Sequence, residues 1–143
     1  MFPLVEIPEL VQHYAPFFAS VFSEKAFIQF QRYISGLIVS ENKTVEGINR
    51  LFVLEVRNQS SLNRFLTESP FSGEALNQAR LALLASLPGT QMKKKGVLSV
   101  DDTHLSHYGR FFDQIAYLYD PAEKRYMWAH NLVNLHYSDD LTD

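Results

Sequence analysis

The first 86 residues carry apolar side chains at three- and four-residue steps, which is the period of an amphipathic helix. The clearest pattern covers 24–38, and Ser23 before it suits an N-cap. The same period predicts four further helices, over about 8–22, over about 45–55, from Ser60 or Ser61 onward, and over about 73–86. Pro16 should kink or split the first of these, because proline lacks the N–H that an inner helical turn requires. The front of the chain is therefore expected to be helical.

Each predicted helix has an apolar stripe that should face a core. In chain order the stripes comprise Leu10, Val11, Tyr14, Phe17, Phe18 and Val21; Phe27, Phe30, Ile34, Leu37 and Ile38; Val45, Ile48, Leu51 and Phe52; Leu62, Phe65 and Leu66; and Leu76, Ala79, Leu83 and Leu84. Thr44 and Ser72 are suited to cap the third and fifth helices. The turn residues from Leu87 to Thr90 should end the last helix.

The pattern changes to short apolar runs after residue 95. Val97, Leu98 and Val100 predict a short buried strand over 96–101. Residues 125–137 predict a long strand that is apolar or aromatic on both faces, and is therefore central and covered on each side. The segments between are expected to be a loop over 104–109, a strand or short helix over 111–119, and a turn over 120–123.

These patterns predict an α+β chain, with a helical bundle over 1–92 and the first strands of an α/β domain over 93–143. Two or three strands with no following helix do not complete an α/β layer, so this second domain is expected to be incomplete. The competing interpretation is a small α+β protein whose helices cover its own sheet.

Composition narrows the class of protein. The absence of cysteine from the 143 residues excludes a disulfide framework, a zinc knuckle and a cysteine nucleophile. No apolar run approaches the roughly 18 residues of a membrane span, and the start of the chain has no basic segment typical of a signal peptide. We therefore expect a cytoplasmic protein without a membrane partner.

Charge differs between the two parts of the chain. Residues 1–95 hold ten Lys/Arg and eight Asp/Glu, a net charge of +2, whereas residues 96–143 hold three and eight, a net charge of −5. This asymmetry is compatible with a DNA-reading module followed by a cation-binding site, and equally with chance variation.

Adjacent carboxylates follow the first predicted strand. Asp101 and Asp102 supply the oxygen ligands that Mg²⁺ or Mn²⁺ prefers. Side chains alternate across a strand, so both can face one ion only if the strand ends between them. One acid is thus the better ligand, and the other would cap a turn or contact Thr103. An ordinary Asp-rich loop entry is the alternative.

Histidines near these acids suggest a second kind of metal site. His104 and His107 could join Asp101 in a His/carboxylate cluster, although this segment has no helical pattern to place both histidines on one face. His130 and His136 lie on one face of the long predicted strand and are expected to be packed or surface residues. The chain has no nucleophile elbow, Walker A loop or dinucleotide fingerprint.

The third and fourth predicted helices suggest a helix-turn-helix-like pair, joined by a connection longer than the usual tight turn. The fourth helix would present Ser60, Ser61, Asn63 and Arg64, side chains that suit contacts with phosphates and base edges. Lys93, Lys94 and Lys95 form a candidate phosphate-contact patch. A solvated helix face and a plain charged linker are the respective alternatives.

The segment VLSVDDT at 97–103 resembles the first acidic motif of bacterial insertion-sequence DDE transposases, which have an RNase H-like core. Three further stretches resemble the same group in order and spacing: YISGL at 33–37, NQSSLNRFLTESPF at 58–71 and AHNLV at 129–133. The likeness covers most of the chain. The run that leads to Ser69-Pro70 is more distinctive than the short acidic motif.

The resemblance implies a helical region for DNA contact and a core whose three acids bind two Mg²⁺ or Mn²⁺ ions. It places the first acid at Asp101, with Asp102 as the alternate. In the family the second Asp and the Glu lie far downstream, and Asp139, Asp140 and Asp143 sit too early to replace them. The resemblance therefore implies a transposase fragment that binds insertion-sequence ends, assembles as a homodimer on DNA, and is inactive alone.

Two other classes of function stay open from the residues themselves. One is a stand-alone DNA-binding regulator, which needs no metal. The other is a small metal hydrolase that uses Asp101, Asp102, His104 and His107. The recognised DNA sequence cannot be read from the candidate DNA-contacting residues.

Overall fold

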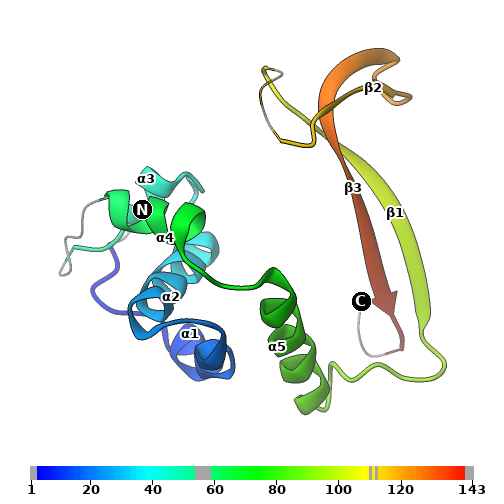
Figure 1. The fold of residues 1–143 in the computed structure, drawn as a ribbon. Coiled ribbons are helices and arrows are strands. Elements are labelled where there is room, and N and C mark those ends of the chain that lie inside the picture. The colour runs from blue at the N-terminus through cyan, green and yellow to red at the C-terminus, as the bar shows by residue number, and fades with distance from the viewer. Residues whose placement is uncertain (1–2, 54–58, 110, 112, 141–143) are drawn as a thin grey trace. The chain divides into compact units, whose positions relative to one another are not determined.

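The computed structural model describes residues 3–53, 59–109, 111 and 113–140 (Figure 1). In chain order the elements are α1 (Glu9–Tyr14), the 3₁₀ helix η1 (Ala15–Val21), α2 (Glu24–Val39), α3 (Val45–Asn49), α4 (Gln59–Glu68), α5 (Gly73–Ser86), β1 (Val97–Ser106), β2 (Ala116–Asp120) and β3 (Arg125–Ser138). Helices followed by an antiparallel sheet confirm the expected α+β class. The chain divides into two compact units, Met1–Ser86 and Leu87–Asp143, here called the helical unit and the sheet unit.

The first predicted helix is split, as expected at Pro16. The α-helix ends at Tyr14 and the chain continues as η1, with Pro16 in its first turn. Val11 packs into the core, whereas Leu10 and Phe17 stay about half exposed, so their assignment to the buried stripe was wrong. A 3₁₀ helix has three residues per turn, and this tighter winding turns Phe17 out of a stripe that assumes 3.6.

The core of the helical unit lies where α2 meets α3 and α4 (Figure 1). Its buried residues are Val11, Ala15, Ala26, Phe30, Ile48, Leu51, Phe52, Leu62 and Phe65. Ser23 caps α2 as predicted, because its Oγ accepts a hydrogen bond from the Ala26 N–H at 3.4 Å. Ile38, predicted to be buried, is exposed one residue before the end of α2, so its assignment to the buried stripe was wrong.

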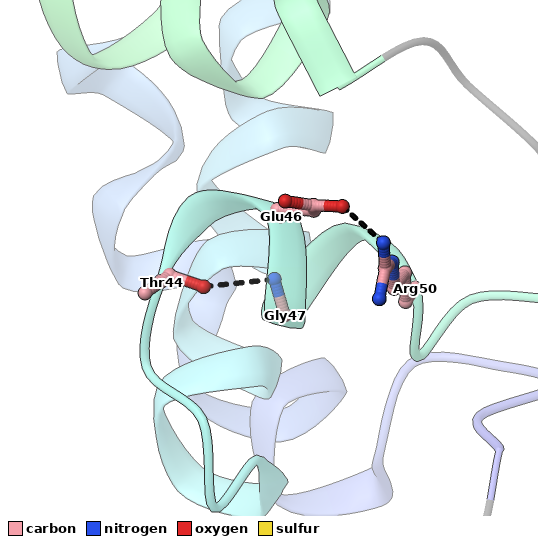
Figure 2. A network of polar contacts seen from close by, with 4 residues as sticks. All are labelled: Thr44, Glu46, Gly47 and Arg50. Atoms are coloured by element: carbon pink, nitrogen blue, oxygen red, sulfur yellow. Dashed lines mark hydrogen bonds and ion pairs between the residues drawn. The ribbon is translucent and has the colours of Figure 1, made fainter.

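The predicted cap of α3 is confirmed (Figure 2). Thr44 Oγ1 accepts a hydrogen bond from the Gly47 N–H at 3.1 Å, which satisfies one of the free donors of the first turn. One turn later, Arg50 pairs with Glu46 across four residues. Both of these side chains are exposed, so this ion pair contributes little to stability.

The predicted length of the third helix was wrong, because α3 ends at Asn49 rather than near residue 55. The chain then leaves the helix to pair with the N-terminal segment. The Leu4 N–H donates to the Leu51 carbonyl at 2.7 Å, and the Val53 N–H donates to the Leu4 carbonyl at 3.3 Å. These bonds replace helical ones. The rest of the predicted helix, at 54 and 55, lies outside the described residues.

The fourth and fifth helices follow the predicted pattern closely. In α4, Leu62 and Phe65 are buried as predicted, but Leu66 is exposed, since only one narrow stripe of this short helix meets the core. The bounds of α5 match the prediction, and Ser72 Oγ accepts the Ala75 N–H at 3.3 Å. The stripe of α5 is only partly buried. None of the helices in the described ranges combines the length and apolarity needed to cross a bilayer.

The sheet has the order β1-β3-β2, and both pairings are antiparallel (Figure 1). The long strand β3 is central and lies within one residue of its predicted bounds. It pairs with all ten residues of β1, from Val97 opposite Ser138 to Ser106 opposite Ala129. The ambiguous segment before the turn is a strand over Ala116–Asp120.

Two predictions about the sheet were wrong. First, β1 runs on through His104 to Ser106 instead of ending at the acids, because its pairing with β3 supplies a backbone partner for a stretch that has no apolar pattern. Second, β1 is exposed rather than buried, and β3 is not covered on both faces. Ala129 is the one buried hydrophobic residue of the sheet unit among the residues described.

Candidate functional site

The register of β1 on β3 separates the two adjacent acids. Directly opposite residues of an antiparallel pair point to the same side, and neighbours along a strand point to opposite sides. Asp101 lies opposite Asn134, whereas Asp102 lies opposite Val133. The two carboxylates therefore project from opposite faces of the sheet, in the middle of a strand.

The two faces differ in chemistry. The face of Asp101, here called the polar face, carries in its middle Ser99, Asp101, Thr103, Asn134 and His136, with Leu132 opposite Thr103 as the one apolar residue there. The face of Asp102, here called the aliphatic face, carries Leu98, Val100, Val133 and Leu135, each at least 60% exposed. Asp101 thus has the polar surroundings in which a hydrated cation is held, and Asp102 stands among aliphatic side chains.

A complete metal cluster is not assembled. Within the described ranges, no three His, Asp or Glu side chains gather in a way that could hold a metal ion. The hypothesis of an Asp101, Asp102, His104 and His107 cluster was therefore wrong. Its physical reason is the strand: His104 shares the aliphatic face with Asp102, so it points away from Asp101. Asp101 alone offers one carboxylate toward a divalent cation.

The three lysines of the candidate phosphate patch stand in an exposed turn before β1. Tyr137, near the end of β3, holds this turn: its hydroxyl accepts the Lys93 N–H and donates to Asp139 Oδ2 at 2.6 Å. Gly96 permits the arrangement, since a Cβ there would lie 2.1 Å from the Tyr137 ring. The lysine side chains are thereby placed at one end of the β1–β3 pair.

The same contacts change the acidity of Tyr137. Partial burial, and after it the hydrogen bond to the Asp139 carboxylate, raise the pKa of the Tyr137 hydroxyl above its ordinary value. The backbone hydrogen bond to Lys93 acts in the opposite direction. The phenol therefore stays protonated, and able to donate, over the whole neutral range.

The outward side of α4 carries the other candidate DNA contacts. Leu62 and Phe65 anchor the helix to the core, and Ser60, Asn63 and Arg64 are exposed on its other side. The helix packs against both α2 and α3. Nine residues separate the end of α3 at Asn49 from the start of α4 at Gln59, so the connection is much longer than a tight helix-turn-helix turn.

A groove of about 540 Å³ lies between α2 and α4. Its wall includes Ser61 and Arg64 from α4, and Lys25 and Gln29 from α2. Gln29 is buried, and its Oε1 has no hydrogen-bond partner within the described part of the chain. The wall of this groove thus carries the cations of Lys25 and Arg64, the Glu68 carboxylate, the Gln29 acceptor and three serine hydroxyls, beside the helix predicted to contact DNA.

One cluster was missed by the sequence reasoning. His130 Nδ1 lies 2.8 Å from His107 Nε2, and His130 Nε2 lies 2.7 Å from the Asp113 carbonyl oxygen. The two rings meet edge to face, with centroids 4.7 Å apart. The sequence carries no local signal for this pair, because the two residues are 23 positions apart and only the pairing of β1 with β3 brings them together.

Comparisons with known proteins identify no similar protein. No protein-family model, no curated protein and no solved structure matches this chain. Support for a function therefore comes from the residues, the sheet register and the resemblance of motifs.

Proposed function

We propose that this chain is the front part of a DDE-type transposase, whose helical unit binds the ends of an insertion sequence. Its sheet unit would contribute the first acid of the catalytic centre. The observation that supports this most is the position of Asp101, on the polar face of a strand that pairs along its full length with the central strand β3. A carboxylate on such a fixed backbone can hold a cation with little loss of order.

The polar face favours Asp101 over Asp102 as the acid that binds Mg²⁺ or Mn²⁺. Its neighbours Ser99, Thr103 and Asn134 offer further oxygen atoms for a hydrated ion. Two more acids are required for two-metal chemistry on a phosphodiester, in which the ions stabilise the attacking and leaving oxygens. The chain alone should therefore bind metal weakly.

DNA contact is assigned to the exposed side of α4 and to the lysine turn. Asn63 and Arg64 have the hydrogen-bonding geometry for base edges, whereas Ser60, Ser61 and Lys93–Lys95 suit phosphates. Because its proposed partner is DNA, we propose that the protein acts in the cytoplasm. We also propose that two copies bind together, one on each of the paired element ends.

The test is selection of duplexes from a random DNA library by the full 143-residue chain, followed by titration at several salt concentrations. Asn63→Ala should relax sequence preference, at a cost of about 1–3 kcal/mol for the preferred duplex. Lys94→Ala should weaken all duplexes alike and reduce the salt slope by about 1. Arg80→Ala is the matched control, because Arg80 is an exposed arginine on α5 that already bonds to Asn77.

Failure to enrich any sequence, together with binding whose affinity does not change with salt concentration, would contradict the proposed DNA contact.

The proposed catalytic role has a separate test. The isolated chain should not nick DNA in Mg²⁺ or Mn²⁺, because it assembles no three-acid cluster in its described residues. Robust nicking that Asp101→Ala abolishes would overturn that part.

A stand-alone DNA-binding regulator is the second candidate. It is favoured by the helical unit, which has a closed core of its own and holds α4 in place without the sheet unit. This function predicts the same salt-dependent binding but no effect of Asp101→Ala on any activity. Metal-dependent enhancement of binding that requires Asp101 would favour the transposase instead.

A further inference from the structure

The pair formed by His107 and His130 has the geometry of a ligand pair for a transition metal. His107 follows the end of β1, and His130 lies on β3, on the same face as Asp101. The nitrogens that face each other are His107 Nε2 and His130 Nδ1, 2.8 Å apart. Both side chains are half-buried, which limits competition from bulk water.

The hydrogen bond to Asp113 fixes the protonation of His130. A carbonyl oxygen only accepts, so the Nε2 atom that lies 2.7 Å from the Asp113 carbonyl must carry the proton. In neutral His130 the Nδ1 atom then carries a lone pair, which faces His107 Nε2 and can act as a metal ligand. A second hydrogen bond from the far ring nitrogen to a backbone carbonyl is the usual support of a metal-binding histidine.

The distance between the facing nitrogens is also close to the distance between two nitrogen ligands of one metal ion. Two nitrogens bound to one tetrahedral Zn²⁺, each about 2.0–2.1 Å from it, lie about 3.3–3.4 Å apart. The pair would need to open by only about half an ångström to admit the ion. Small rotations of the two rings provide that, and His107 can move its own proton to Nδ1 to expose Nε2.

We propose that His107 Nε2 and His130 Nδ1 together bind a borderline divalent transition metal such as Zn²⁺, with water at the remaining positions. Imidazole nitrogen suits Zn²⁺, Ni²⁺ and Cu²⁺, whereas Mg²⁺ prefers oxygen, so this site is separate from the carboxylate site at Asp101. The metal would tie the start of the β1–β2 connection to the central strand. The site does not depend on the proposed DNA function.

The experiment is a titration of the full chain with Zn²⁺, in which calorimetry measures the binding and nitrogen-15 spectra of the imidazole rings identify the ligand atoms. His130→Gln keeps an N–H near the Nε2 position, which can still reach the Asp113 carbonyl, but removes the Nδ1 ligand. It should weaken Zn²⁺ binding at least about tenfold, and His107→Gln should do the same. His136→Gln is the matched control, since His136 is an exposed histidine on the same face of β3.

The spectra give a signature that a merely structural role would not produce. In the Zn²⁺-bound chain, His130 should bind the ion through Nδ1 while its Nε2 keeps the proton, and His107 should bind the ion through Nε2. Excess Mg²⁺ should not displace Zn²⁺. Binding that survives both Gln variants, or a wild-type chain that binds Zn²⁺ no better than the double variant, would overturn the proposal and leave a hydrogen-bonded pair only.

Discussion

The helical unit and the sheet unit are stabilised in different ways. In its described residues the helical unit buries nine hydrophobic side chains in one cluster, among them Ile48, Leu51 and Leu62 at 1% exposure or less. The described part of the sheet unit buries only Ala129, and aliphatic residues such as Val100 and Leu135 are about 70% exposed. The first unit is held by side-chain packing, and the second by backbone pairing along β3.

This difference shows that a regular sheet need not contain a core. Three strands with no apolar cover form a marginal structure, because backbone hydrogen bonds replace bonds to water and give a modest net gain. Stacked aromatic pairs on the polar face add some support, such as Tyr117 on Tyr126 at 5.5 Å between centroids. The sheet unit should therefore respond less to loss of a side chain than the helical unit.

The largest contrast should come from the same substitution in both units. Leu62→Ala removes a side chain that is 1% exposed and should destabilise the helical unit by about 2–5 kcal/mol. Leu135→Ala removes one that is 68% exposed and should change stability by less than about 0.5 kcal/mol. Urea unfolding followed separately for helix and sheet signals measures both. Equal effects would show that Leu135 is buried in solution.

A smaller effect is expected from added volume. Gly36→Ala places a Cβ 2.2 Å from Ile48 Cγ2, and Ile48 is fully buried, so the core must shift. We expect a loss of about 1–3 kcal/mol in spite of the better helix propensity of alanine. Gly73→Ala is the control, because a Cβ there meets nothing within 4 Å. Thermal unfolding of the two variants distinguishes crowding from propensity.

Loss of the α3 cap should cost less. Thr44→Ala removes the acceptor of the Gly47 N–H and should destabilise the helical unit by about 1 kcal/mol. Thr44→Ser keeps the hydroxyl and should restore most of it. Hydrogen exchange at the Gly47 amide is the direct measurement. An unchanged exchange rate in the alanine variant would mean that the cap does not form.

The smallest effect is a pH dependence confined to the sheet unit. The folded pKa of Tyr137 is raised, so its contribution to stability is complete below the ordinary value near 10 and is lost as pH rises through the folded pKa. Phenolate absorbance against pH measures that pKa, and Asp139→Asn should lower it. Tyr137→Phe should remove this pH dependence. If the stability of the helical unit showed the same pH dependence, another titrating group would be its cause.

Sequence reasoning succeeded where local signals agree. The bounds of α2 and α5 followed from apolar period and from Ser23 and Ser72 as caps, since these signals lie within a few residues of each helix end. It failed where the bounds of an element depend on a partner far away in the sequence. The short length of α3 depends on pairing with Leu4, and the far half of β1 depends on β3.

The candidate site divides along the same line. Alternation along a strand already implied that Asp101 and Asp102 point apart, but only the register identifies which of them has polar neighbours. The histidine pair could not be predicted, since His107 was grouped with its sequence neighbour His104 and its partner lies on another strand. Contacts that need a register are beyond a single sequence.

The doubled acid gives β1 a form of redundancy. If one residue before Asp101 were deleted and the strand kept its place on β3, every later side chain would exchange faces. Asp102 would then occupy the position opposite Asn134 that Asp101 now holds. A lineage that carries two acids in tandem could thus lose a codon here and still present a carboxylate on the polar face.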